Sequence, residues 1–203
     1  MDDRPPATEA ESRELDRVGA FSDGVFAIAI TLLVLNLDVP DVPGDDLGSA
    51  LRSLDGDIQA YFIGFAVIGF FWYGHHKLFA QIDRSDGALL LCNFVLLSLI
   101  ALMPFSTALL GGYDEPLAVA AYAVNVGAAA LADGLTEFIA VRRRLVPDGA
   151  LSAQGDLLRG AIMRTGVFFL SIPIAYVNVA AAQWFWLLLI AVPRANRAMA
   201  RWT

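Results

Sequence analysis

Charged residues and cysteine are both scarce in this chain. Lys, Arg, Asp and Glu make up 17% of its 203 residues, and hydrophobic residues make up 57%. A soluble domain carries about 25% charged residues. The single cysteine, Cys92, lies inside an apolar block, so an internal disulfide and a cysteine-based metal cluster are excluded. Together these shortages favour a polytopic membrane protein over a soluble domain.

Familiar catalytic and ion-filter motifs are missing as well. The sequence has no GxSxG, HExxH or Walker loop and no Cys/His nucleophile arrangement, so we expect neither enzymatic activity nor a cofactor. The potassium-filter motif TVGYG is also missing, so any ion path must lack a carbonyl filter. The two histidines, His75 and His76, are adjacent and make a poor chelating pair on a helix, so we expect no protein-bound metal.

Six apolar blocks predict an all-α protein with six membrane-spanning helices. Residues 1–16 are acidic and lack a basic n-region, which predicts a cytoplasmic tail rather than a cleaved signal peptide, followed by one membrane domain over residues 17–203. A minimal connection around Ala182 and Gln183 predicts a tight hairpin between the last two spans. The predicted spans are Arg17–Leu37, Ile58–Lys77, Ala88–Leu110, Leu117–Val141, Ala161–Ala181 and Trp184–Met199.

The positions of the basic residues predict the orientation of these spans. With the N-terminus inside the cell, all but one of the 14 Lys and Arg residues fall in cytoplasmic segments, and the exception is Arg52. The long loop over residues 38–57 is instead rich in aspartate. Six spans with both termini cytoplasmic therefore account for the charge distribution, whereas five or seven spans would place basic residues on both sides of the membrane.

The first span begins with polar and ionisable residues. Arg17, Ser22 and Asp23 lie in its first third, and such groups usually face protein or water rather than lipid. Arg17 and Asp23 are roughly 240° apart around a helix, so they cannot pair along one face. Each is expected to find a partner on another helix or subunit.

The rest of the first span carries an apolar stripe. Ile28, Leu32 and Leu35 follow the i, i+4, i+7 spacing of one helical face, and Thr31 lies beside them. From spacing alone, ordinary packing inside a helical bundle is the favoured interpretation.

Two further polar clusters lie in later spans. Trp72, His75, His76 and Lys77 end the second span, either as an interfacial anchor or with one histidine contacting Asp23 or Arg17. In the fourth span, Asp133 and Glu137 share a helical face shortly before Arg142–Arg144. A salt-bridged anchor is favoured there over a proton or ion relay.

The string Arg17-x-x-x-Phe21-Ser22-Asp23, followed by GVFAIAITLLVL, resembles the RxxxFSD signature of the TMEM175 potassium channels. The Trp72–His75/His76 cluster and the six-span layout agree with this resemblance. It implies a homotetramer in a prokaryotic plasma membrane, arranged with four-fold symmetry around the first helix. The expected partners are copies of the same chain and the lipid bilayer, with no nucleic acid.

The resemblance also implies roles for individual residues. It reassigns the apolar stripe from packing to pore lining, with Ile28, Leu32 and Leu35 narrowing the pore and Thr31 as a polar layer. The residues implied to brace the first helix against its neighbours are Arg17, Phe21, Ser22, Asp23, Trp72 and one of His75 and His76.

The resulting functional hypothesis is a leak-like cation channel with K⁺ as the permeant ion, modestly preferred over Na⁺. An apolar constriction demands partial dehydration, which K⁺ tolerates better than the smaller Na⁺. The alternative is a secondary or proton-coupled transporter that uses Asp23, His75 or His76, Asp133 and Glu137. A third class is a structural membrane protein without permeation.

Overall fold

The computed structural model describes residues 9–146 and 154–186. Within these ranges the chain is helical and contains no strand, which confirms the predicted all-α class. The elements are α1 (Glu9–Leu32), η1 (Leu33–Asn36), η2 (Gly44–Asp46), α2 (Leu47–Ser53), α3 (Asp55–Phe79), α4 (Gly87–Gly112), α5 (Pro116–Arg142), α6 (Gln154–Ala175) and α7 (Val179–Phe185).

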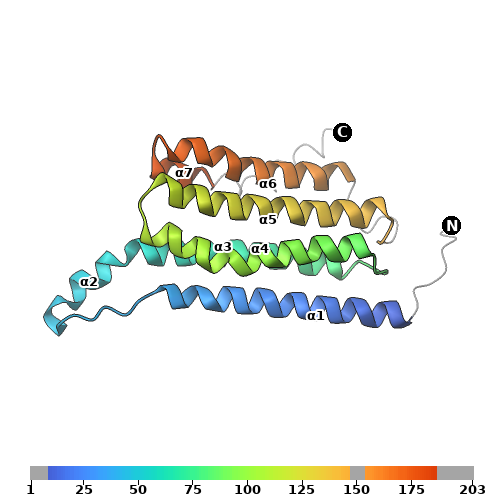
Figure 1. The fold of residues 1–203 in the computed structure, drawn as a ribbon, viewed down its shortest axis with the longest axis horizontal. Coiled ribbons are helices and arrows are strands. Elements are labelled where there is room, and N and C mark those ends of the chain that lie inside the picture. Colours follow the sequence, from blue (N-terminus) through green and yellow to red (C-terminus); the bar gives the residue numbers. More distant parts are fainter. Residues whose placement is uncertain (1–8, 147–153, 187–203) are drawn as a thin grey trace.

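The long helices lie side by side in a flat bundle, with α1 at one edge and α6 at the other (Figure 1). Helix α1 packs against α3 and α4, while α5 packs against α4 and α6. The segment with α2 extends beyond one end of the bundle (Figure 1). The α1 helix begins at Glu9 and continues without a break across the expected boundary between residues 16 and 17.

Local sequence signals explain where several helices begin. The carboxylate of Asp86 accepts hydrogen bonds from the backbone N–H groups of Ala88 and Leu89, at 2.9 and 3.2 Å, and so caps α4. Helix α5 begins with Pro116, which has no N–H to leave unpaired in the first turn. Each start follows a short polar connection, as expected between membrane-spanning helices.

Most of the predicted spans coincide with described helices. Within the described ranges, three helices are long and apolar enough to cross a membrane, namely α1 continued by η1, α4 and α5. A fourth is added if α2 and α3, which meet at 46°, form one span. The apolar part of α6, Gly160–Ala175, is shorter. The sixth predicted span lies outside the described residues apart from Trp184–Trp186. Six spans therefore remain a prediction.

The predicted hairpin turn around Ala182 and Gln183 is wrong. Helix α6 ends at Ala175 and α7 begins at Val179, so Ala182 and Gln183 lie within a helix. The side chain of Asn178 accepts a hydrogen bond from the backbone N–H of Ala181 at 2.8 Å and starts α7 there. Asparagine is a strong N-cap residue, and this cap interrupts an apolar block that hydropathy alone presents as continuous.

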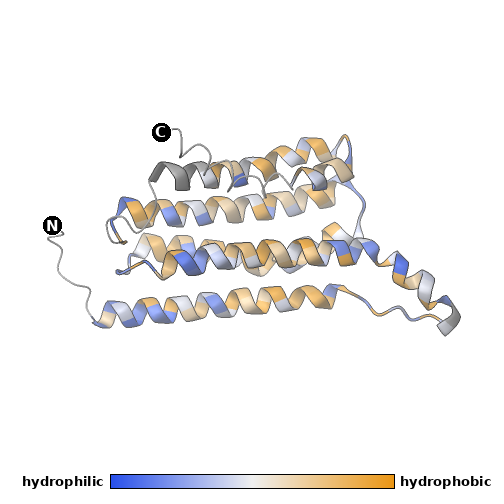
Figure 2. Ribbon diagram, turned by 180° about the vertical axis from the view of Figure 1, so that it is seen from behind, coloured by the Kyte–Doolittle hydropathy of each residue, from blue (hydrophilic) through white to orange (hydrophobic). Residues whose placement is uncertain are grey.

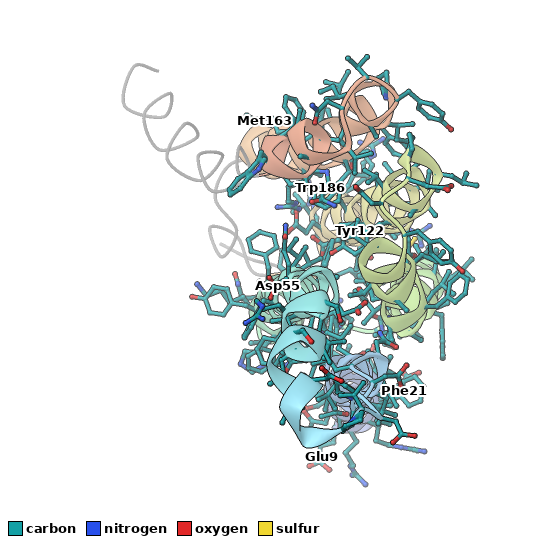
Figure 3. The ribbon with its side chains drawn as sticks, turned by 90° about the vertical axis from the view of Figure 1, so that its left-hand side faces the viewer. Glu9, Phe21, Asp55, Tyr122, Met163 and Trp186 are labelled. Carbon is teal, nitrogen blue, oxygen red and sulfur yellow. The ribbon has the colours of Figure 1, made fainter. Side chains whose placement is uncertain are left out.

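The interior of the bundle is tightest between α5 and α6. A Cβ atom added to Gly134 would lie 2.2 Å from the Cβ of Ala161, so the two helices approach to a distance that only glycine permits. Tyr122 and Trp186 pack with their ring centroids 5.1 Å apart, and Figure 3 shows them between the α1 edge and the α6 edge. This half of the subunit is held by close packing.

The helices are hydrophobic along much of their length (Figure 2). Large hydrophobic side chains on α3, α4, α5 and α6 remain exposed, for example Phe62, Leu91, Leu131 and Leu170. A soluble monomer rarely exposes apolar surface on this scale. The exposure agrees with a protein whose outer surface contacts lipid or further subunits.

Candidate functional site

One face of α1 packs into its own subunit. Ser22, Phe26, Ala29 and Leu33 are all buried, and their spacing follows one stripe of an α-helix. This stripe contacts α3 and α4. The opposite face is therefore directed away from the rest of the bundle.

The predicted stripe lies on that opposite face. Ile28 is 62% exposed, Leu32 41% and Leu35 70%, so none of the three belongs to the core of the subunit. The hydroxyl of Thr31 donates to the carbonyl oxygens of Ala27 and Ile28 in its own helix, at 3.0 and 2.9 Å. Packing inside the subunit, the interpretation favoured by spacing alone, does not account for these side chains.

A buried chain of hydrogen bonds joins α1, α4 and α3. His75 Nε2 lies 2.9 Å from Asn93 Oδ1, Asn93 Nδ2 donates to Ser22 Oγ at 3.1 Å, and Ser22 Oγ donates to the Val18 carbonyl at 2.8 Å. Because an amide oxygen only accepts, His75 Nε2 carries the proton in this arrangement. The three hydrogen bonds then all run in the same direction, from His75 through Asn93 and Ser22 to the backbone carbonyl of Val18.

A second link joins α1 to α3 beside this chain. Trp72 Nε1 donates to Asp23 Oδ1 at 2.9 Å, and the His76 ring stacks on Trp72 with centroids 5.6 Å apart. Asp23, His75 and His76 also line a hollow of about 560 Å³ between α1 and the end of α3. The polar part of α1 is thus hydrogen-bonded to α3, through Asp23 and Trp72, beside this solvent-accessible hollow.

The remaining motif residues lie at the edge of this arrangement. Phe21 is 54% exposed and approaches Phe94 of α4, with centroids 5.9 Å apart; Figure 3 shows it on α1 at the edge of the bundle. Arg17 is exposed and makes no hydrogen bond or ion pair with any residue that the structure describes.

The structure therefore brings most of the motif residues together, with different roles for the two histidines. His75 is buried and reaches Ser22 through Asn93, whereas His76 stacks on Trp72, which binds Asp23. Asn93 was not among the predicted residues. Its signal was present, because Asn93 is the only amide in the apolar run LLLCNFVLLSLIAL.

The acidic pair on α5 forms a separate cluster, in which Asp133 is buried and Glu137 is half-buried. Arg164 of α6 lies 3.0 Å from the Asp133 carboxylate and 3.9 Å from that of Glu137. This agrees with the favoured salt-bridged anchor, and the cation comes from Arg164 of the neighbouring helix α6. Among the arginines that follow in sequence, Arg143 binds Asp86.

The groups named for the alternative transporter do not form one site in the described ranges. Asp23 lies on α1, which packs against α3 and α4, and Asp133 and Glu137 lie with Arg164 between α5 and α6. Among the described residues there is also no group of three or more His, Cys, Asp or Glu placed to hold a metal ion.

Known proteins resemble this chain in sequence. A family model described as endosomal/lysosomal potassium channel TMEM175 matches residues 17–104. A potassium channel of Streptomyces collinus is 44% identical over 126 residues, covering 59% of this chain and 61% of the relative. A potassium channel of Chamaesiphon minutus is 45% identical over 121 residues, covering 58% and 60%. The alignments thus span about three-fifths of these curated relatives. The human endosomal/lysosomal proton channel TMEM175 is 38% identical over 101 residues, covering 45% of this chain and 20% of that protein.

Solved structures resemble this chain over about nine-tenths of its length. The crystal structure of a lysosomal potassium-selective channel TMEM175 homolog from Chamaesiphon minutus superposes with a TM-score of 0.77 and 30% identity, covering 91% of this chain and 98% of that one. A variant of the potassium channel MtTMEM175, bound to a nanobody fusion, has a TM-score of 0.61 and 19% identity, covering 92% and 94%, and supports the fold alone. With the RxxxFSD string in place on α1, these matches show that the chain belongs to the TMEM175 family of membrane channel proteins.

Proposed function

We propose that this chain is a leak-like, K⁺-permeable channel of a prokaryotic plasma membrane. The chain assembles as a homotetramer of six-span subunits with cytoplasmic termini, and the first helix lines a central pore. The observation that carries the proposal is the apolar stripe on α1, whose side chains are exposed although the opposite face of the same helix is buried. In a family of channels, a helix with one packed and one unpartnered face is suited to surround a pore.

The stripe would act as a hydrophobic constriction. Four copies of Ile28 form a ring that loses water when narrow and admits it when slightly wider, so the ring can gate without charged groups. Thr31 is the polar member of the stripe, and its donated hydrogen bonds to Ala27 and Ile28 leave its oxygen free to accept. Selectivity arises from the lower dehydration cost of K⁺, so the preference over Na⁺ is modest.

The polar start of α1 would brace the pore helix rather than contact the ion. Asp23 is held by Trp72, and Ser22 is joined to His75 through Asn93. We expect Asp23→Ala to lower the yield of tetramer on size-exclusion chromatography more than it changes K⁺/Na⁺ preference. A well-assembled tetramer with altered preference would contradict the bracing role.

Ile28→Asn tests the pore assignment. The substitution should increase K⁺ flux from reconstituted liposomes or relax K⁺/Na⁺ selectivity. The reason is that a constriction lined by four amide side chains stays hydrated, whereas one lined by four isoleucines can lose its water. Ile162→Asn on α6 is a matched control, since Ile162 is 61% exposed and Ile28 is 62% exposed in the subunit. Flux that is unchanged in Ile28→Asn, or equally changed in Ile162→Asn, would reject the pore.

The same liposomes separate the other two classes of function. Passive flux down a K⁺ gradient supports a channel, whereas saturating flux that requires a coupling gradient supports a carrier. Proton flux belongs in the same series, because the human relative is named a proton channel. Cross-linking that detects only monomers would favour a protein without permeation, since one subunit supplies one first helix.

A further inference from the structure

The C-terminal end of α1 changes from an α-helix to a 3₁₀ helix. The change occurs after Leu32, and η1 continues through Asn36. Leu37 leaves the helix in an extended conformation, with φ −96° and ψ 98°, and its N–H bonds to the Val34 carbonyl at 3.1 Å. Short 3₁₀ segments are frequent at the C-terminal ends of α-helices, where they tighten the last turn.

The 3₁₀ winding determines which way two pairs of side chains point. In a 3₁₀ helix, side chains three residues apart eclipse one another. Leu35 therefore lies in line with Leu32 on the exposed face, and Asn36 lies in line with Leu33 on the packed face, as their burial shows. Continued α-helical winding would turn Leu35 about 60° away from Leu32.

Asn36 ties this turn to α4. Its Nδ2 donates to the carbonyl oxygen of Pro104 at 2.9 Å. Pro104 is buried inside α4, where its missing N–H removes one backbone hydrogen bond from that helix. Helix α3 closes the same region, since a Cβ added to Gly64 would lie 3.2 Å from a methyl of Leu33. The turn is thus held by a packed leucine and one amide.

We propose that Asn36 is a positioning residue of the pore. Its hydrogen bond to Pro104 stabilises the 3₁₀ turn and thereby keeps Leu35 in line with Leu32 at the outer end of the constriction. The pore helix is then anchored at both ends, by Ser22 and Asp23 before the stripe and by Asn36 after it. The inference rests on the proposed function, because Leu35 faces an ion path only if α1 lines a pore.

The test measures the reaction rate of single cysteines with a charged methanethiosulfonate reagent, applied from both sides to the tetramer in liposomes. Leu35→Cys and Ile28→Cys are made in a Cys92→Ala background, each with and without Asn36→Leu. We expect Asn36→Leu to change the rate at Leu35→Cys by about fivefold, the shift that losing one such hydrogen bond produces. The rate at Ile28→Cys, two turns away, should remain the same.

Asn178→Ala is the control, because it removes an asparagine hydrogen bond at the start of α7, away from α1. It should leave both rates unchanged. Asn36→Ala also removes the amide that donates to Pro104, so the same measurement can be made on it if Asn36→Leu does not assemble. An unchanged rate at Leu35→Cys in an assembled Asn36 variant would overturn the proposal. So would loss of the tetramer in both Asn36 variants, because Asn36 would then be a folding residue.

The two failures are distinguishable. If the reagent does not alter K⁺ flux through either cysteine variant with Asn36 intact, the pore assignment itself is wrong. If the reagent blocks flux through both cysteine variants and Asn36→Leu changes neither reaction rate, the pore assignment is supported and the proposed role of Asn36 is wrong.

Discussion

Asn93→Leu tests the buried hydrogen-bond chain that ties α1 to α3 and α4. Leucine keeps the branching of asparagine at Cγ and is the larger side chain, so the substitution removes the amide without opening a cavity. It takes away the acceptor of the His75 N–H and the donor to Ser22 Oγ. Ser22 is 0% exposed, and His75 is only 2% exposed although it borders the hollow, so water cannot readily replace the lost bonds.

The expected destabilisation follows from these two losses. His75 is left with an unpaired buried N–H, which costs about 1–3 kcal/mol. Ser22 keeps its donated bond to the Val18 carbonyl and loses only the bond it accepts, which costs about 0.5–1.5 kcal/mol. The free energy of unfolding should therefore fall by about 1.5–4.5 kcal/mol.

Unfolding in graded SDS, followed by circular dichroism in mixed micelles, measures this loss. Ser22→Ala combined with Asn93→Leu should cost less than the sum of the single variants, by about 0.5–1.5 kcal/mol, because the Ser22–Asn93 bond is lost only once. Ser98→Ala on the exposed face of α4 is the control and should stay within about 0.5 kcal/mol of wild type. An Asn93→Leu loss no larger than that of the control, or strict additivity in the double variant, would refute the reasoning.

Two further predictions concern charged groups away from α1. Arg164→Met leaves the buried Asp133 and the half-buried Glu137 without their cation, so stability in graded SDS should fall by about 3 kcal/mol, the lower end for a broken buried ion pair; a loss below about 1 kcal/mol would contradict this role of Arg164. Burial opposes ionisation of Asp86, but hydrogen bonds from Arg143 and from backbone N–H groups outweigh it and hold the pKa of its carboxyl below the usual value. A depressed pKa stabilises the fold above the unfolded-state pKa, and this contribution is lost as pH falls through the folded-state pKa. Acid unfolding followed by circular dichroism should therefore be less steep in Asp86→Asn, and an unchanged profile would contradict this role.

The helices and the importance of the first span were predictable, since both depend on local properties. Long apolar blocks with few charges form helices in a membrane because no other open backbone conformation satisfies its own hydrogen bonds there. The RxxxFSD string marked α1 because polar groups in such a block need partners. The partners themselves were not predictable in the same way. Asn93 lies 71 residues from Ser22, and nothing in the spacing of either residue indicates the pairing.

The predicted turn around Ala182 and Gln183 was at the wrong residues for a related reason. Hydropathy averages over many residues, whereas the end of a helix depends on one side chain, here the cap made by Asn178. The partner of the α5 carboxylates was not predicted either. Arg142–Arg144 are nearer in sequence, but the close approach at Gly134 and Ala161 brings Arg164 of α6 to Asp133.

By itself the sequence determined the all-α class, the membrane setting and the family signature, because hydropathy and a short motif are properties of neighbouring residues. Only the tertiary structure decided which face of α1 is packed. Ile28 and Phe26 are similarly apolar, yet Phe26 is buried against the bundle and Ile28 is exposed. The difference arises because Ser22, Asp23 and Asn36 bind groups on α3 and α4 that are distant in the chain, and these bonds set the rotation of the helix. Composition cannot encode that rotation, since it depends on where the other helices stand.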